Sequence, residues 1–289
     1  RSQTVTGVQT CALPICTNVM HRVYVDDVAQ ALRLAAEEGE PGEAYNCGDR
    51  QAVTLGVKSL SETDRRAIAG IYDTSLRKLD RVTHALVEGL RQRDLLDDTV
   101  VVIVSDHGEG LGDHGMLGHE YSLYGALTRI AMMARYPRQW PSGSRSDVPA
   151  QIQDVHATLL GLAGVERAEV PGYAGIDLAR PGDLDIAPRP RLAEYLAPKR
   201  GHVDNVSAAF PGQVQPERWM RRLRALQNGP YKLIWVEDGS HELYDLSADP
   251  GEMDDLIDGQ PERAREMLDR MQRIVQRAAK RGYDVSELE

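Results

Sequence analysis

The chain has 289 residues, with 34 lysines and arginines against 44 aspartates and glutamates, and a formal net charge of −10 at pH 7. So acidic a protein repels a phosphate backbone, and we expect no nucleic-acid partner. No apolar run reaches the roughly 20 residues of a membrane helix, so we also expect no membrane span. The three cysteines, Cys11, Cys16 and Cys47, all lie near the N-terminus. Their use does not indicate a compartment, and the localisation stays open.

Residues 1–20 are not expected to form part of a domain. Residues 1–15, RSQTVTGVQTCALPI, lack the basic and apolar segments of a signal peptide and resemble a translated sequencing adapter. Cys11 and Cys16 do not have the C-x-x-C spacing of a metal or redox pair. Residues 1–20 are therefore expected to lie outside the fold.

Residues 21–56 form a distinct segment, with predicted strands at Val23–Val25 and Ala44–Cys47 and a helix after Asp26. The segment resembles the later part of the extended short-chain dehydrogenase/epimerase family, in which YVDDVA precedes a GE-x-YN-x-G strand. The family's glycine-rich nucleotide loop and Tyr-x-x-x-Lys pair are absent from this segment. We interpret residues 21–56 as an epimerase-like fragment that has no partner surface on the rest of the chain. An alternative function, that of an NAD-dependent epimerase or dehydratase fragment, rests on residues 21–56 alone.

A long amphipathic helix is predicted over residues 61–93. Ser61 and Asp64 have the S-x-x-D spacing of a capping box. The residues that follow at helical spacing are apolar: Ile68, Ile71, Tyr72, Leu76, Leu79, Val82, Leu86 and Leu90. Charged residues fill most other positions, so we expect the apolar face of this helix to pack on a sheet.

The strand that follows is the centre of the predicted fold. Val100–Val104 is an unbroken β-branched run, which is typical of a parallel strand buried on both faces. Ligands of open α/β sheets bind beyond the carboxyl ends of the strands. Asp106 and His107 come at that position, so the sequence predicts a ligand site there.

Three interpretations of this loop are open from the residues alone. Asp106 and His107 offer an oxygen and a nitrogen ligand, and the glycines after them allow the loop to bend around an ion. The same pair could instead only cap the next turn. A zinc site of His107, His114 and His119 is a further possibility, although their spacings fit no standard zinc signature.

The remaining elements suggest two structural parts. A strand over residues 129–136 and a helix over 152–163 continue the sheet core, which we place at residues 57–220. The region 171–216 is rich in proline and glycine and is predicted to be mostly loop, with a possible strand at 192–196. Two strands flank Asp238-Gly239, a strong hairpin signal, and a helix begins at Pro261. Residues 221–289 should thus form a small antiparallel sheet with a C-terminal helix.

Two long motifs resemble the sulfatase family of the alkaline phosphatase superfamily. They are LLDDTVVVIVSDHGEGLGDHGMLGHEYSLYGALTRIAMMARYP and, near the end, YKLIWVEDGSHELYDLSADPGEMDDL. The resemblance implies an α/β fold over residues 57–289: an alkaline phosphatase-like sheet with flanking helices, incomplete here, and a small C-terminal antiparallel sheet. It implies a hydrolase whose partner is a small-molecule or glycan sulfate ester.

The resemblance also assigns roles within the site. Asp106 and His107 match the later pair of ligands to the family's metal, Ca²⁺ or Mg²⁺. His119 stands where many relatives have a lysine that assists the leaving oxygen, so a catalytic role is implied for it. The family's nucleophile is a formylglycine made in a C-x-P-x-R or S-x-P-x-R motif, and the sequence contains neither. We therefore expect the chain as given to be truncated and to have little or no turnover.

Other functions remain open beside a sulfatase. A related phosphodiester or phosphonate ester hydrolase would use a similar site. A non-catalytic binding module would keep the fold without the nucleophile.

Overall fold

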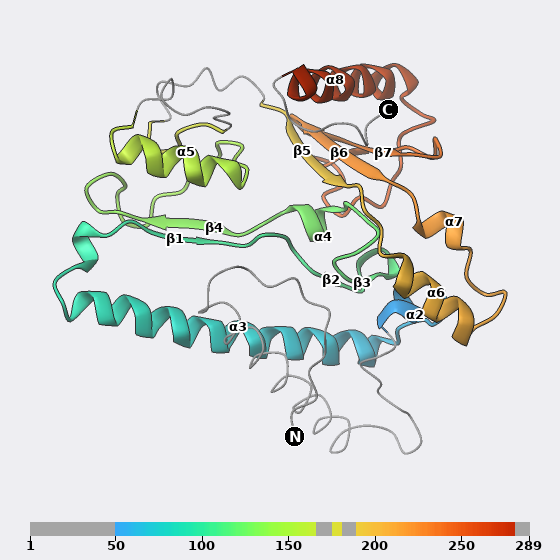
Figure 1. The fold of residues 1–289 in the computed structure, drawn as a ribbon, viewed down its shortest axis with the longest axis horizontal. Helices are drawn as coiled ribbons and strands as arrows, with labels where there is room; N and C mark the ends of the chain where they lie inside the picture. The colour runs from blue at the N-terminus through green and yellow to red at the C-terminus, as the bar shows by residue number, and fades with distance from the viewer. Residues whose placement is uncertain (1–49, 166–174, 181–188, 281–289) are drawn as a thin grey trace, which may run out of the picture.

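The computed structural model describes residues 50–165, 175–180 and 189–280 (Figure 1). The helices of this part are α2 (Arg50–Thr54), α3 (Glu62–Arg91), α4 (Gly125–Thr128), α5 (Gln153–Leu162), α6 (Arg200–Ala209), α7 (Pro216–Trp219) and α8 (Pro261–Lys280). Its strands are β1 (Val101–Val104), β2 (Gly110–Leu111), β3 (Leu117–Gly118), β4 (Met132–Arg135), β5 (Arg191–Tyr195), β6 (Leu223–Asn228), β7 (Tyr231–Val236) and β8 (Glu242–Asp245). The elements predicted for residues 1–49 lie outside the described residues. Among those described, no helix has the length and apolar character needed to cross a membrane.

The predicted long helix is present as α3, but its apolar face is not covered. The capping box forms as expected: Asp64 N donates to Ser61 Oγ at 3.1 Å, and Ser61 N donates to Asp64 Oδ2 at 2.8 Å. No residue of α3 is buried. Exposed apolar side chains form one stripe along it: Tyr72, Leu76, Leu79, Val82 and Leu86, between 37% and 61% exposed. The expectation that this face packs on a sheet is therefore wrong for the described residues.

Strand β1 forms where it was predicted, but not in the predicted environment. It pairs with β4 in antiparallel orientation, with Val101 opposite Arg135 and Val104 opposite Met132. Within the described residues these two strands make a sheet by themselves, so β1 has a ladder partner on one edge only. Ile103 and, on β4, Met133 are exposed by 37% and 57%. The expectation of a parallel strand buried on both faces is therefore wrong for the described residues. The valine-rich run is typical of a strand buried on both faces, but the described residues cover β1 only in part.

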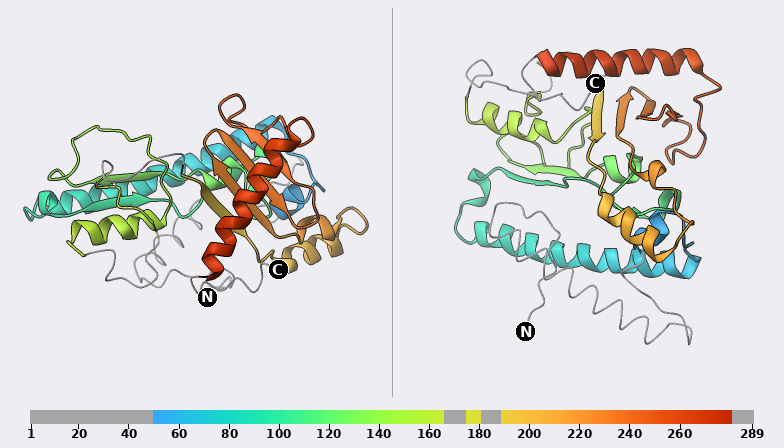
Figure 2. Two further views of the ribbon diagram at one scale, coloured as in Figure 1. Left: turned by 90° about the horizontal axis from the view of Figure 1, so that it is seen from above. Right: turned by 45° about the vertical axis from the view of Figure 1, so that its right-hand side comes forward.

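The C-terminal part is a four-stranded antiparallel sheet in the order β5-β6-β7-β8. The predicted hairpin is confirmed, with Tyr231 opposite Asp245. Helix α8 lies across one face of this sheet (Figure 2), where Met267 and Met271 pack on Leu226, Leu233 and Leu243. Strand β5 belongs to this sheet, because Leu192 pairs with Leu226. The sequence predicts this strand in the sheet core of residues 57–220, but β5 pairs with β6, so the C-terminal sheet includes a strand from before its predicted start at residue 221.

Residues just before the proposed boundary at residue 57 belong to the same folded unit as those after it. Ala52 and Leu55 are buried in a cluster with Tyr121, Val203 and Val206. Thr54 Oγ1 donates to Leu117 O at 2.7 Å, which ties α2 to β3. The expectation that the whole of residues 21–56 lacks a partner surface is therefore wrong for residues 50–56, and a junction between unrelated segments would lie before Arg50.

Candidate metal site at the end of β1

The turn after β1 carries the two predicted ligands, Asp106 and His107, and its backbone is fixed by hydrogen bonds. His107 N donates to Asp106 Oδ1 at 3.0 Å, and Gly108 N donates to Leu127 O at 2.8 Å. A Cβ at Gly108 would lie 1.9 Å from Ala126 O, so only glycine fits this close approach. Asp106 directs its carboxylate outward, with a side chain 80% exposed. The turn leaves both side chains accessible beyond the strand end.

A short hairpin brings two further side chains to this turn. Strands β2 and β3 pair with Gly110 opposite Gly118, so Glu109 and His119 are the next residues on either side. Glu109 Oε2 lies 3.0 Å from His119 Nδ1, within hydrogen-bonding distance. This bond orients the His119 ring, as a carboxylate commonly does for a functional imidazole.

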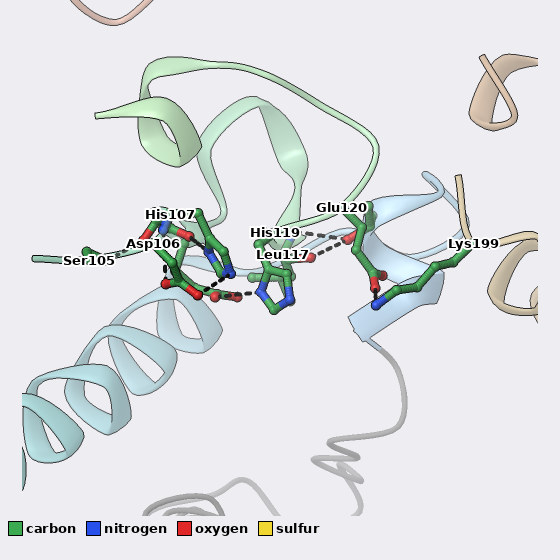
Figure 3. A network of polar contacts seen from close by, with 10 residues as sticks. Ser105, Asp106, His107, Leu117, His119, Glu120 and Lys199 are labelled. Atoms are coloured by element: carbon green, nitrogen blue, oxygen red, sulfur yellow. Dashed lines mark hydrogen bonds and ion pairs between the residues drawn. The ribbon is translucent and has the colours of Figure 1, made fainter. Parts of the chain in front are cut away.

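The two histidines then meet at one rim (Figure 3). The His107 and His119 ring centroids are 4.3 Å apart. His107, Glu109 and His119 each offer one ligand atom, and these atoms lie within 4.8 Å of one another. Asp106 is adjacent, with its Oδ2 3.8 Å from His107 Nε2. The structure therefore brings together Asp106, His107 and His119, to which sequence reasoning gave roles, and adds Glu109, which it had not considered.

His114 does not join this group. Its ring stacks on Tyr124 with centroids 3.6 Å apart, and its Nε2 lies 3.1 Å from Gly251 O. His114 therefore cannot be a ligand beside His107 and His119, and the suggested zinc site of these three histidines is wrong. The hairpin turns His114 away, because Gly112 and His114 adopt left-handed backbone conformations that reverse the chain between β2 and β3.

A second polar cluster lies beside the rim, and sequence reasoning did not find it. Glu120 is buried, and its Oε1 accepts a hydrogen bond from Lys199 Nζ at 2.8 Å (Figure 3). His202 Nδ1 lies 2.9 Å from the other carboxylate oxygen, Glu120 Oε2. Burial alone would raise the pKa of Glu120, but the hydrogen bond from Lys199 and the charges of His202 and Lys199 outweigh it and lower that pKa. The residues are some 80 positions apart, so no local pattern connects them. The cluster fastens the segment after His119 to α6.

The donor atoms can be compared with what each class of ion requires. Calcium and magnesium take oxygen ligands, with six or more around the ion. The described rim offers two carboxylates, from Asp106 and Glu109, so it supplies part of such a set. It can therefore hold one side of a hard cation.

Comparison with known proteins identifies what this arrangement is similar to. Residues 35–165 match the family model described as Sulfatase, a match that begins inside the segment 21–56. Over 200 residues the chain is 27% identical to the choline-sulfatase of Rhizobium meliloti (strain 1021), covering 69% of this chain and 35% of that protein. It is 30% identical over 186 residues to the uncharacterized sulfatase YidJ of Escherichia coli (strain K12), covering 63% of this chain and 31% of that protein. The matched part spans about a third of these relatives.

Solved structures show the same fold. BT4656, in complex with its substrate D-glucosamine-2-N,6-O-disulfate, is 25% identical with a TM-score of 0.55, covering 72% of this chain and 40% of that one. The phosphonate monoester hydrolase of Agrobacterium radiobacter has a TM-score of 0.60 at 19% identity, covering 83% of this chain and 50% of that one. The expected alkaline phosphatase-like α/β fold is confirmed, and the matches support a sulfatase part within this chain.

Proposed function

We propose that this chain is the C-terminal part of a sulfatase-family hydrolase that cleaves sulfate esters with the help of a divalent cation. The observation that carries the proposal is the meeting of Asp106, His107 and His119 at the end of β1, within a sulfatase-like sequence and fold. The cation, Ca²⁺ or Mg²⁺, would be held on one side by Asp106 and His107, where it would draw charge from the sulfate oxygens.

His119 has the role of proton donor in this proposal. Its Nδ1 is held by Glu109 at 3.0 Å, so its Nε2 is the ring atom left for the substrate. An imidazole aimed in this way can protonate the departing ester oxygen and so avoid an unstable alkoxide. Its side chain is 35% exposed, which leaves room for an ester to reach it.

In this proposal, the nucleophile comes from a part of the protein outside this sequence. The chain has no C-x-P-x-R or S-x-P-x-R motif at any position. The chain also covers only 40% of the BT4656 chain and 50% of the Agrobacterium hydrolase chain. We propose that the missing part carries the formylglycine and the remaining carboxylate ligands.

In this proposal, the missing part binds the uncovered apolar surfaces. Helix α3, which carries the exposed apolar stripe, lies on one side of the β1–β4 ladder, and α5 lies on the other (Figure 1). β1 has an unpaired edge within the described residues. We propose that strands of the missing part pair along β1 and cover α3, because such strands would bury both surfaces in one step.

The proposed substrate is a small-molecule or glycan sulfate ester. Choline-sulfatase is a relative, and BT4656 binds a sulfated glucosamine. A phosphonate or phosphodiester is the second candidate, because the Agrobacterium hydrolase shares the fold.

Reconstitution tests the proposal. The genomic sequence upstream of the Val57 equivalent should encode a C-x-P-x-R or S-x-P-x-R motif. The joined protein, matured to formylglycine, should hydrolyse an aryl sulfate in the presence of Ca²⁺ or Mg²⁺, whereas the 289-residue chain should show no turnover above background. Assays with an aryl sulfate and an aryl phosphonate identify the ester class. Equal sulfatase activity in the chain alone would contradict the proposal.

The docking surface has its own test. Replacing Leu79 and Leu86 with glutamate puts two charges into the stripe of α3, and each buried leucine is worth about 2 kcal/mol of assembly. We expect the double variant to lose binding of the separately expressed missing part, measured by co-purification and analytical ultracentrifugation. Arg77→Glu, on the opposite face of α3, is the matched control and should assemble normally. Normal assembly of the double variant would place the contact elsewhere.

A further inference from the structure

Residues 249–252, DPGE, belong to the second sulfatase-like motif and lie outside the proposed site, yet they contact the segment that follows it. The Glu252 carboxylate oxygen Oε2 accepts a hydrogen bond from Gly125 N, at the start of α4. We propose that Glu252 is a positioning residue, which through α4 holds the turn that carries Asp106 and His107. This inference rests on the proposed function, because it gives Glu252 a part in presenting those two ligands to the cation.

The Glu252 carboxylate is enclosed and held by an ion pair. Glu252 is 3% exposed, and its Oε1 lies 2.5 Å from the Nζ of Lys232, which is equally buried. Lys232 Nζ also lies 3.3 Å from Thr128 Oγ1, at the other end of α4. A carboxylate enclosed and paired in this way keeps one position, so its second oxygen fixes where α4 begins.

The backbone of Glu252 has a conformation that is unusual for a glutamate. Its φ is 57°, in the left-handed region that a residue with a Cβ rarely adopts. Asp249 Oδ2 stabilises this turn by accepting hydrogen bonds from Met253 N and Asp254 N at 2.6 and 2.8 Å. The fold thus retains an unfavourable backbone conformation where it directs a charged side chain inward to α4.

Helix α4 is in direct contact with the turn after β1. Gly108, the residue after His107, donates its N–H to Leu127 O at 2.8 Å. A Cβ at Gly108 would lie 1.9 Å from Ala126 O, so the two backbones meet with no side chain between them. Because so close a contact has no slack, a shift of α4 moves the turn. Loss of the Glu252 acceptor should therefore displace the two ligands from the rim.

Two double variants isolate the acceptor oxygen. In the glutamine variant, Glu252→Gln with Lys232→Met, an oxygen remains for Gly125 N and no charge is left unpaired. In the methionine variant, Glu252→Met with Lys232→Met, the same space is filled without that oxygen. The two proteins differ only at residue 252, so a difference between them reports the hydrogen bond to α4.

Amide hydrogen exchange of the full chain, followed by NMR, tests the contact without any need for activity. The Gly108 amide should exchange about tenfold faster in the methionine variant than in the glutamine variant, while the amides of β5 and β6 keep their rates. Equal Gly108 rates in the two variants, or equally faster exchange in β5 and β6, would overturn the inference. If the methionine variant does not fold, Glu252→Asp withdraws the carboxylate and should give the same pattern relative to wild type.

The reconstituted hydrolase separates positioning from a loss of folded protein. With an aryl sulfate, the methionine variant should need about tenfold or more Ca²⁺ than the glutamine variant for half-maximal rate. A lower rate at saturating Ca²⁺ with the same half-saturating concentration would indicate lost enzyme and overturn the inference. Glu194→Gln removes a carboxylate 2.7 Å from Arg224 Nε in the same sheet, and as the control it should change neither measurement. An inactive wild-type hydrolase would contradict the proposed function, whereas Gly108 exchange in the full chain would still decide the role of Glu252.

Discussion

In the reconstituted hydrolase, Asp106→Ala should lower kcat/KM for an aryl sulfate by about a hundredfold or more, equivalent to about 2.7 kcal/mol of transition-state stabilisation. Asp106 presents the most exposed carboxylate of the rim, at 80%, and its oxygens have few protein contacts that compete with a cation. Removal of this carboxylate should therefore weaken both the binding of Ca²⁺ or Mg²⁺ and the rate.

Two variants in the same loop separate the roles in this prediction. His119→Ala should lower kcat by about 10² to 10⁴ while leaving the affinity for Ca²⁺ or Mg²⁺ unchanged, because it removes a proton donor and not a ligand of that cation. Asp113→Ala removes another exposed carboxylate, whose contact is with Leu111 N at 3.2 Å, and should stay close to wild type. Full activity of Asp106→Ala would contradict its role as a ligand.

The largest loss of stability should come from Asp154→Ala. Asp154 is fully buried at the start of α5, where Gln151 N and Ile176 N donate to it at 2.7 and 2.9 Å. Arg189 adds a two-pronged ion pair at 2.6 and 2.9 Å. The alanine variant leaves a largely buried guanidinium and two backbone N–H groups without their acceptor. The free energy of unfolding should fall by about 3–5 kcal/mol.

An exposed pair of the same type provides the control. Arg135 Nη2 lies 2.6 Å from Asp97 Oδ1, but Asp97 is 80% exposed. Asp97→Ala should therefore cost about 1 kcal/mol or less. Urea unfolding of the full chain, followed by circular dichroism, measures both variants. If the two unfolding midpoints shift equally, the burial of Asp154 is not the source of its contribution.

The helices and the hairpin follow from short-range patterns in the chain. The Ser61–Asp64 capping box and the apolar spacing of α3 are set by neighbouring residues, as is the turn at Asp238-Gly239. The position of Asp106 and His107 after β1 follows in the same way, because a strand ends where its apolar run ends. These features depend on residues a few positions apart, whose geometry the backbone fixes locally.

The partners of these elements depend on contacts that no local pattern encodes. The hairpin register puts Glu109 opposite His119 and turns His114 toward Gly251. This separation is not evident from the sequence, where His107, His114 and His119 lie within 13 residues. Glu120 meets Lys199, and Asp154 meets Arg189, only because the chain returns to them after long intervals. The run Val100–Val104 indicates burial on both faces, but which strands provide that burial depends on long-range packing. A propensity for burial belongs to the residues themselves, whereas the surface that satisfies it is supplied by segments distant in the chain.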